Sequence, residues 1–391
     1  MLKRTRSFLV LVMLLMTVTM SAQVTTATMS GKVTAQDEPI IGATIVAIHE
    51  PSGTRYGTVT NVSGQFNLQG MRTGGPYKVE ISYVGYQTAI YKGINLLLGE
   101  NYVLNVSLKE SSELLDEVVV TASKESNMKS DRAGAIMNAN RDMISNTPTI
   151  SRSISDIMRL SPQGADVGNG FAVGGGNYRQ SFVTVDGAAF NNTFGLGGNL
   201  PANGSPISLD ALEQVTVAVT PFDVRQSGFT GGAINAVTRS GDNQFRGTAY
   251  MYFNNENLKG SKVDDYELLR SKAQYYTYGA SFGGPIIKDK LFFFVNGEYE
   301  DNVTAGSNYR PRTALGESYS GGNIHRPLQS DMDDMRGFLL NKYNFDPGKY
   351  NDYSTDTPAY RVMARVDWNA NQNNKVSFRF TKTHTKDSNF P

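Results

Sequence analysis

The sequence predicts a mainly β protein built from successive β-containing units. Short runs of β-branched and aromatic residues alternate with turn residues along most of the 391 residues. Glycine, tyrosine and phenylalanine are abundant, at 39, 20 and 19 residues, which is typical of β-rich proteins with many turns. In the last third, apolar and polar residues alternate strictly over successive stretches, a pattern that favours an antiparallel barrel.

Composition excludes several classes of function. The chain has no cysteine, so disulfides, thiolate metal sites and a cysteine nucleophile are excluded. Its histidines, His49, His325 and His384, lie far apart and lack metal-ligand spacing. A net charge of +1 gives no electrostatic reason to expect nucleic acid as a partner. We therefore predict no enzyme activity, no catalytic residues, no metal and no cofactor.

Residues 1–22 have the form of a secretory signal peptide. Lys3, Arg4 and Arg6 make a basic start, and residues 8–16 form an apolar run too short to span a bilayer. Ser21 and Ala22 supply small residues for cleavage near residue 22. The alternative is an N-terminal membrane anchor.

Residues 24–108 predict a β-sandwich, because short strands recur between regularly spaced turn signals. The expected strands are 29–35, 43–50, 56–61, 64–70, 77–86 and 101–109. The segments GKV…PIIGATIVAI, TVTNVSGQFNL and YKVEISYVGYQT resemble a carboxypeptidase regulatory-like domain. That resemblance implies a non-catalytic periplasmic extension; a generic immunoglobulin-like spacer is the alternative.

Residues 109–130 form a polar linker interrupted by one apolar run. Three consecutive valines have high β-propensity and no evident partner strand, so they could add to the edge of another protein's sheet. An ordinary strand is the alternative. The octapeptide resembles the TonB box of Bacteroidetes transporters, which implies that TonB binds Leu115, Asp116, Glu117, Val118, Val119, Val120, Thr121 and Ala122.

Residues 131–243 predict a small α+β domain. Ser153 and Asp156 have capping-box spacing for a short helix whose apolar residues are Ile154, Ile157 and Met158. Strands are expected at 183–185, 215–219 and 234–237, and a Gly- and Asn-rich loop at 191–204 is a candidate for ligand contact.

The segments TVDG, LDALEQVTV and GGAINAVTRSG resemble the plug domain of TonB-dependent outer-membrane transporters. The segment PFDVRQSGFTGGAINAVTRSG is similar to the plug sequence of their Oar-like branch. The usual x-x-G-P-x-x-x-x-Y-G segment of plugs is absent, which weakens transfer from siderophore receptors. Arg225 and Arg239 are expected to pair with barrel carboxylates. The resemblance assigns structural or gating roles to Asp186, Gly187, Pro221, Phe222, Asp223, Arg225, Gly231, Gly232, Asn235 and Arg239.

Residues 244–391 predict the first strands of a transmembrane β-barrel, about five in number. Alternation marks strands at 245–254, 276–282, 291–300, 360–368 and 376–381, with apolar residues toward lipid. Long connections at 255–274 and 301–358 alternate with short turns at 284–289 and 369–374, as in outer-membrane barrels. A soluble sandwich is the alternative. The acidic run at 331–335 is expected in a solvated loop rather than a calcium site.

These features predict the N-terminal portion of a TonB-dependent transporter for active uptake of an unidentified ligand. Five strands cannot close in lipid, so a longer protein is expected. The resemblance implies outer-membrane localisation, with outer-membrane lipids and TonB with its proton-driven inner-membrane complex as partners. A SusD-like lipoprotein is not favoured, because the plug is Oar-like rather than SusC-like. The alternatives are an adhesion or structural protein without uptake, a truncated non-functional fragment, or a secreted soluble binding protein.

Overall fold

The computed structural model of the chain divides into two compact parts. One part comprises Met1–Gly247, Ser281–Asn296 and Val362–Lys382, and the other comprises Thr248–Ala280, Gly297–Arg361 and Thr383–Pro391. The residues described are 25–110, 118–121, 135–149, 152–167, 170–191, 200–201, 204–219, 230–258, 260, 262–264, 266–267, 272–305, 310–319, 324–350, 354–371 and 374–386. The predicted signal peptide lies outside these residues.

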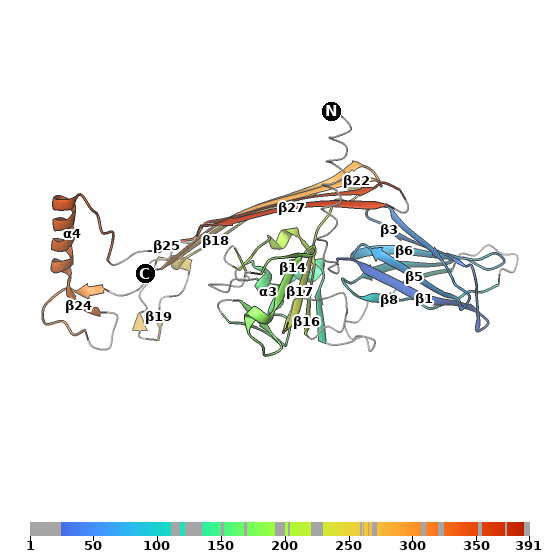
Figure 1. Cartoon of the computed structure of the whole chain (residues 1–391), viewed down its shortest axis with the longest axis horizontal. Coiled ribbons are helices and arrows are strands. Elements are labelled where there is room, and N and C mark those ends of the chain that lie inside the picture. Colours follow the sequence, from blue (N-terminus) through green and yellow to red (C-terminus); the bar gives the residue numbers. More distant parts are fainter. Residues whose placement is uncertain are drawn as a thin grey trace, which may run out of the picture. The chain divides into compact units, whose positions relative to one another are not determined.

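The N-terminal domain is a β-sandwich, as predicted (Figure 1). In one sheet β1 pairs with β2, β5, β8 and β9; the other has the order β10-β7-β6-β3-β4. The strands are β1 (Ala27–Ala35), β2 (Glu38–Pro39), β3 (Thr44–His49), β4 (Thr54–Val59), β5 (Gln65–Met71), β6 (Gly74–Ser82), β7 (Ala89–Leu96), β8 (Asn101–Val103), β9 (Val106–Ser107) and β10 (Val118–Thr121). Strands β7 and β10 were not among the strands expected in this domain.

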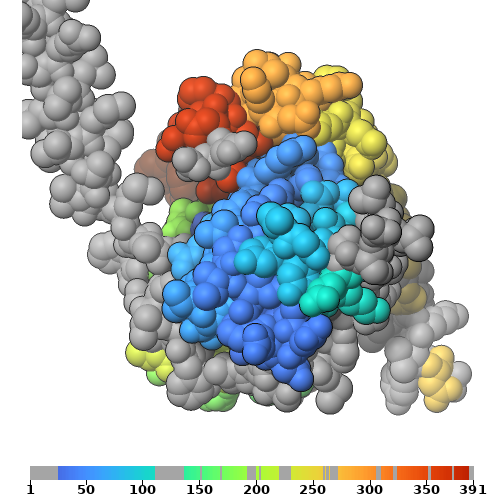
Figure 2. All heavy atoms as spheres, turned by 90° about the vertical axis from the view of Figure 1, so that its right-hand side faces the viewer, coloured from blue at the N-terminus to red at the C-terminus, as the bar shows by residue number. Residues whose placement is uncertain are grey.

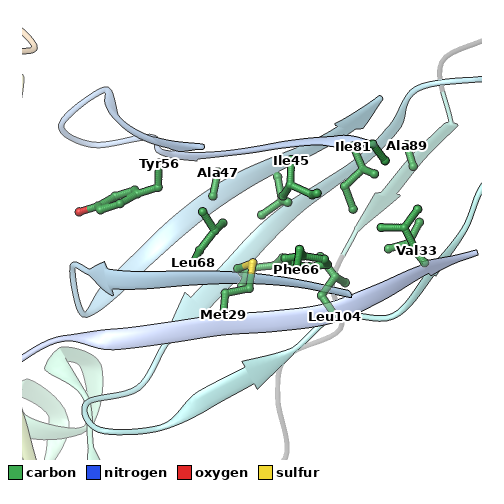
Figure 3. Close-up of a cluster of buried hydrophobic side chains, with 14 of the residues drawn as sticks. Met29, Val33, Ile45, Ala47, Tyr56, Phe66, Leu68, Ile81, Ala89 and Leu104 are labelled. Carbon is green, nitrogen blue, oxygen red and sulfur yellow. The ribbon is translucent and has the colours of Figure 1, made fainter. Parts of the chain in front are cut away.

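Alternate residues of the two sheets meet in one hydrophobic core. Figure 3 shows Met29 and Phe66 of one sheet opposite Ile45 and Ile81 of the other. Each of these side chains is buried. In a sandwich every second residue of a strand faces inward, which agrees with the alternation of apolar and polar residues in the sequence. The surface of this domain appears in blue and cyan in Figure 2.

A buried histidine gives this domain a pH-dependent stability. Burial, and secondarily the charge of Arg72, lowers the pKa of His49 from 6.5 to about 3. Its Nδ1 lies 2.7 Å from Ser52 Oγ, and its ring centroid lies 5.0 Å from that of Tyr77. As the pH falls below 6.5, His49 becomes protonated in the unfolded chain but stays neutral in the folded domain. The free energy of unfolding therefore decreases between pH 6.5 and 3.

Acidification from pH 7 to 5 is therefore expected to destabilise the N-terminal domain by about 2 kcal/mol through His49. Hydrogen–deuterium exchange of peptides covering β3 measures this as faster local opening at pH 5, after correction for intrinsic exchange. His49→Gln should remove most of the difference between the two pH values. An unchanged pH dependence in that variant would show that other groups dominate.

The next unit is a small α+β domain, as predicted. Its sheet has the order β11-β16-β17-β14-β15, with β14 parallel to β17 and the other pairs antiparallel. A second, two-stranded sheet pairs β12 with β13. The elements are β11 (Ala135–Ala139), α2 (Arg141–Asn146), α3 (Ile154–Met158), β12 (Gly164–Asp166), β13 (Phe171–Val173), η2 (Tyr178–Gln180), β14 (Phe182–Val185), β15 (Ala188–Ala189), η3 (Leu209–Ala211), β16 (Leu212–Val219) and β17 (Gly232–Thr238).

The predicted helix forms where its capping signal lies. Ser153 is the N-cap of α3, and its backbone N–H donates to Asp156 Oδ2 at 3.3 Å. Ile154, Ile157 and Met158 are all fully buried in the core of this domain. The apolar face inferred from their spacing is thus the face that packs.

The remaining strands form an antiparallel sheet with the order β18-β21-β22-β26-β27, in which β25 also pairs with β22. The strands are β18 (Arg246–Asn255), β21 (Gln274–Ile287), β22 (Leu291–Ala305), β25 (Ser354–Asp356), β26 (Ala359–Asn369) and β27 (Lys375–Thr385). The turn expected at 284–289 is shorter, because β21 continues to Ile287. Glycine is needed at position 284 of this strand because the Phe245 ring occupies the place where a Cβ would lie.

The connection predicted as a polar loop at 301–358 contains ordered elements. It includes β23 (Arg310–Arg312), β24 (Ile324–Leu328) and the helix α4 (Gln329–Tyr343), and the acidic run at 331–335 belongs to that helix. Shorter elements in the first connection are η4 (Glu256–Leu258), β19 (Lys262–Val263) and β20 (Tyr266–Glu267). No helix among the described residues is both long and apolar enough to cross a membrane.

Candidate functional site

Parts of β22 and β26 bury charged side chains and expose apolar ones, the reverse of a water-soluble protein. In β26 the charged residues Arg361, Arg365 and Asp367 are buried, while Val362 and Trp368 are exposed, at 43% and 51%. In β22 Glu298 and Glu300 are buried, while Tyr299 between them is exposed. Apolar residues outward and polar residues inward are the arrangement of a transmembrane barrel, which favours a barrel over the soluble-sandwich alternative for these strands.

The most deeply buried charge in these strands has two carboxylate partners. Arg361 Nη1 donates to Glu298 Oε1 at 2.9 Å, and Nη2 donates to Glu300 Oε2 at 2.7 Å. The hydroxyl of Tyr250 on β18 donates to the other oxygen of Glu298. Three strands are thereby joined on their polar side, which compensates for part of the cost of burying these charges.

The TVDG motif forms a tight hairpin between β14 and β15. Asp186 and Gly187 are its two loop residues, with φ of 50° and 82°. Positive φ at both positions is the type I′ geometry, which Asp-Gly favours. The turn directs the Asp186 carboxylate to β17, where Oδ1 accepts from the backbone N–H of Thr238 at 3.0 Å and Oδ2 from its hydroxyl.

Asp186 belongs to a set of contacts that we call the Asp186 network: Asp186, Thr238, Arg365, Asp367 and Arg379. Arg379 Nε of β27 lies 3.5 Å from Asp186 Oδ2. Arg365 Nη1 of β26 donates to the Thr238 carbonyl at 2.5 Å, and its Nε lies 2.8 Å from Asp367 Oδ2. All five residues lie in the same compact part of the chain. The network ties the end of β17, the last strand of the α+β domain, to β26 and β27.

The other motif residues are distributed through the α+β domain. The Gly231 N–H donates to the Gln180 carbonyl at 3.1 Å. A Cβ on Gly232 would lie 2.5 Å from Val173, so glycine permits close packing there. Asn235 is buried and accepts a hydrogen bond from the Thr184 hydroxyl at 2.7 Å. These positions shape the domain core rather than present chemical groups to a ligand.

Among the described residues, Arg239 pairs with no carboxylate of the barrel strands, contrary to expectation. Its Nη1 lies 3.6 Å from Asp210 Oδ2, and Asp210 is a residue of the α+β domain that also pairs with Arg141 at 3.0 Å. On the side of the barrel strands, its guanidinium lies 4.9 Å from the ring centroid of Phe294, and its Nη1 lies 3.5 Å from Ser281 Oγ of β21. Burial, reinforced by the nearby charge of Arg141, lowers the pKa of Arg239, and Asp210 opposes this effect.

Part of the predicted site lies outside the described residues: Leu115, Asp116, Glu117 and Ala122 of the octapeptide, and Pro221, Phe222, Asp223 and Arg225. The central residues Val118–Thr121 form β10, so the expected extended conformation is present. The expectation that this segment has no partner strand in its own chain is wrong, because β10 pairs in parallel with β7 of the N-terminal domain.

Arg365 and Arg379 were not predicted from the sequence as partners of the α+β domain. Both lie at polar positions of alternating strands, and each would need a partner when buried. Their positions in the alternating pattern identify both arginines as inward-facing, but the pattern does not identify the residue that each one contacts.

Two regions of the chain match known families. Residues 28–109 match the carboxypeptidase regulatory-like domain, and residues 237–391 match an outer membrane beta barrel domain. The TonB-dependent transporter Oar of Myxococcus xanthus is 27% identical over 242 residues, which cover 60% of this chain and 21% of that protein. The TonB-dependent receptor SusC of Bacteroides thetaiotaomicron is 29% identical over 269 residues, 65% of this chain and 24% of that protein. The chain is homologous to TonB-dependent transporters.

The chain spans about a quarter of the length of these two transporters, at 21% and 24%. Among solved structures, the siderophore receptor PirA from Acinetobacter baumannii aligns with 64% of this chain and 31% of its own, at 16% identity and a TM-score of 0.43. The outer membrane transporter YddB from Escherichia coli aligns with 64% of this chain and 33% of its own, at 12% identity and a TM-score of 0.44. The barrel domain and the homology to TonB-dependent transporters locate the protein in the outer membrane.

Proposed function

We propose that the protein takes part in TonB-dependent active transport of a ligand across the outer membrane. The observation that carries the proposal is the extended segment Val118–Thr121, which lies between the N-terminal domain and the α+β domain in the sequence and pairs through its main chain. A segment able to pair in this way is what strand addition by TonB requires. Export by residues 1–22 and a plug role for residues 131–243 are parts of the same proposal.

In the proposed mechanism the ligand binds on the outer side, and TonB adds a strand to residues 115–122 in the periplasm. Energy from the inner-membrane proton gradient then pulls this segment. The pull reaches the α+β domain, whose last strand is held against β26 and β27 by the Asp186 network. Release of those contacts would open a path for the ligand. The described residues supply ion pairs and hydrogen bonds for this process, and no covalent step is needed.

Deletion of residues 115–122 tests active uptake even while the ligand is unidentified. Host cells that carry the unaltered protein, the deletion variant or no protein are grown in a complex medium. Mass spectrometry then measures which components of the medium each strain depletes. We expect a component whose depletion requires the protein, the segment and an intact proton gradient. An adhesion or structural role instead predicts that the deletion and a protonophore leave depletion unchanged.

A deletion of similar size elsewhere in the linker is the matched control. Removal of residues 123–130 shortens the same polar linker and leaves the octapeptide intact. Normal depletion by this control would assign the effect to the octapeptide and not to linker length. Outer-membrane fractionation confirms that the variants reach the membrane in equal amounts.

A further inference from the structure

The segment assigned to TonB already forms a strand pair within its own chain. β10 runs parallel to β7, with Val118 opposite Ala89, Val119 opposite Ile90, Val120 opposite Tyr91 and Thr121 opposite Lys92. Among the described strands, β10 is the first in the order β10-β7-β6-β3-β4. The segment thus extends the sheet of the N-terminal domain by one strand.

The opposite side of β7 is already occupied by β6. Ala89, Ile90 and Tyr91 pair with Ile81, Glu80 and Val79 of that strand. Without β10, the main-chain groups on the outer side of β7 would form a sheet edge, which readily pairs with another extended segment. The β7 edge is therefore a binding site for an extended peptide, and in this structure residues 118–121 fill it.

The chain leaves the N-terminal domain beside the start of β7. The N–H of Gln87 donates to the Lys109 carbonyl at 2.9 Å, and Tyr86 and Glu110 form an antiparallel bridge. Only residues 111–117 separate this anchor from β10. So short a tether gives the segment a high effective concentration at the β7 edge, in the millimolar range that is usual for short linkers.

We propose that the β7 edge withholds the segment 118–121 from TonB, so that the N-terminal domain restrains engagement of the transporter. This inference rests on the proposed function, because it concerns the segment to which TonB is assigned there. β7 and the strand of TonB use the same kind of main-chain pairing. When the docked form dominates, the apparent affinity of TonB falls in proportion to the undocked fraction.

A reversible disulfide tests the inference. The chain has no cysteine of its own, so an introduced pair reports a single proximity. Lys92 is exposed and Thr121 is its register partner, and neighbouring strands lie about 5 Å apart, within the Cα separation that a disulfide spans. The variant K92C/T121C should form a disulfide rapidly on mild oxidation.

The matched control places the second cysteine at the far edge of the same sheet. Val59 of β4 is exposed, and β4 lies four strands from β10 in the sheet order, about 19 Å away at the usual strand spacing. V59C/T121C should therefore cross-link far more slowly. Equal cross-linking rates for the two pairs would overturn the docking of β10 on β7.

The readout is binding of the purified periplasmic domain of TonB to the detergent-solubilised protein. We expect oxidised K92C/T121C to bind more than about tenfold more weakly than the same protein after reduction. Equal binding by the two forms would show that TonB adds to the free edge of β10 without displacing β7, and would overturn the inference.

The same experiment distinguishes failure of the proposed function from failure of this inference. If neither the unaltered protein nor the reduced variant binds the TonB domain, while K92C/T121C still cross-links faster than its control, the TonB assignment is wrong. The result would then establish strand docking with no role in withholding TonB. Failure of the inference alone leaves TonB binding intact and equal in both redox forms.

Discussion

Replacement of Val119 by proline is expected to abolish binding of the periplasmic domain of TonB. Proline has no main-chain N–H and resists a paired strand, so it removes a donor at the centre of the segment 118–121. We expect a loss of at least about 100-fold in affinity, which corresponds to about 3 kcal/mol. Uptake should be lost with it, while ligand binding on the outer side stays intact. Titration of the solubilised protein with the TonB domain measures the first effect.

The same substitution elsewhere in the linker is the control for Val119→Pro. Ser126→Pro changes the polar stretch that follows the octapeptide, so TonB affinity should stay within about twofold of the unaltered protein. Val119→Pro also removes the register partner of Ile90, which frees the segment from β7. Normal TonB binding by this variant would count directly against assignment of the segment to TonB.

Replacement of Asp186 by alanine is expected to loosen the end of β17 from the barrel strands. The carboxylate accepts two hydrogen bonds from Thr238 and faces Arg379. Removal of one partner from a largely buried ion pair costs about 3–5 kcal/mol, because the remaining charge is left without compensation. Hydrogen–deuterium exchange of a peptide that ends near Thr238 should accelerate by at least about 100-fold.

Two further variants distinguish the loss of the Asp186 charge from the loss of its hydrogen bonds and from the loss of a carboxylate elsewhere. Asp186→Asn keeps a side-chain acceptor and tolerates the positive φ of 50° at this turn, so it should give a smaller acceleration that reports the lost charge alone. Asp142→Ala removes an exposed carboxylate from α2, for which we expect no more than about half a kcal/mol. Equal exchange in all three variants would show that the network does not hold β17.

The strands of the barrel were predicted well because the membrane imposes a simple rule on them. Every second residue must be apolar on the lipid side, and this rule is visible in β22 and β26 whichever strands they pair with. The helix α4 was missed for the opposite reason. Its residues are half-buried or exposed throughout, so no apolar face marks its period in the sequence.

Strand β7 was missed because its local sequence is unfavourable for a strand. Lys92 and Gly93 interrupt it, and Gly93 has a φ of 80°, whereas a search for strands relies on β-branched runs. The valine run of β10 was found, but its partner was not. The contact of Asp186 with Arg379 likewise joins positions far apart in the chain, and only the three-dimensional arrangement pairs them.

The parallel direction of β10 and β7 has a mechanical consequence. A force applied along the axis of β10 loads all its main-chain hydrogen bonds with β7 together, in shear. A sideways pull opens the same bonds one after another from one end. We therefore expect the strand pair to resist a force along its axis and to separate readily under a sideways force. Force spectroscopy with handles attached in the two directions would register this difference as unequal rupture forces.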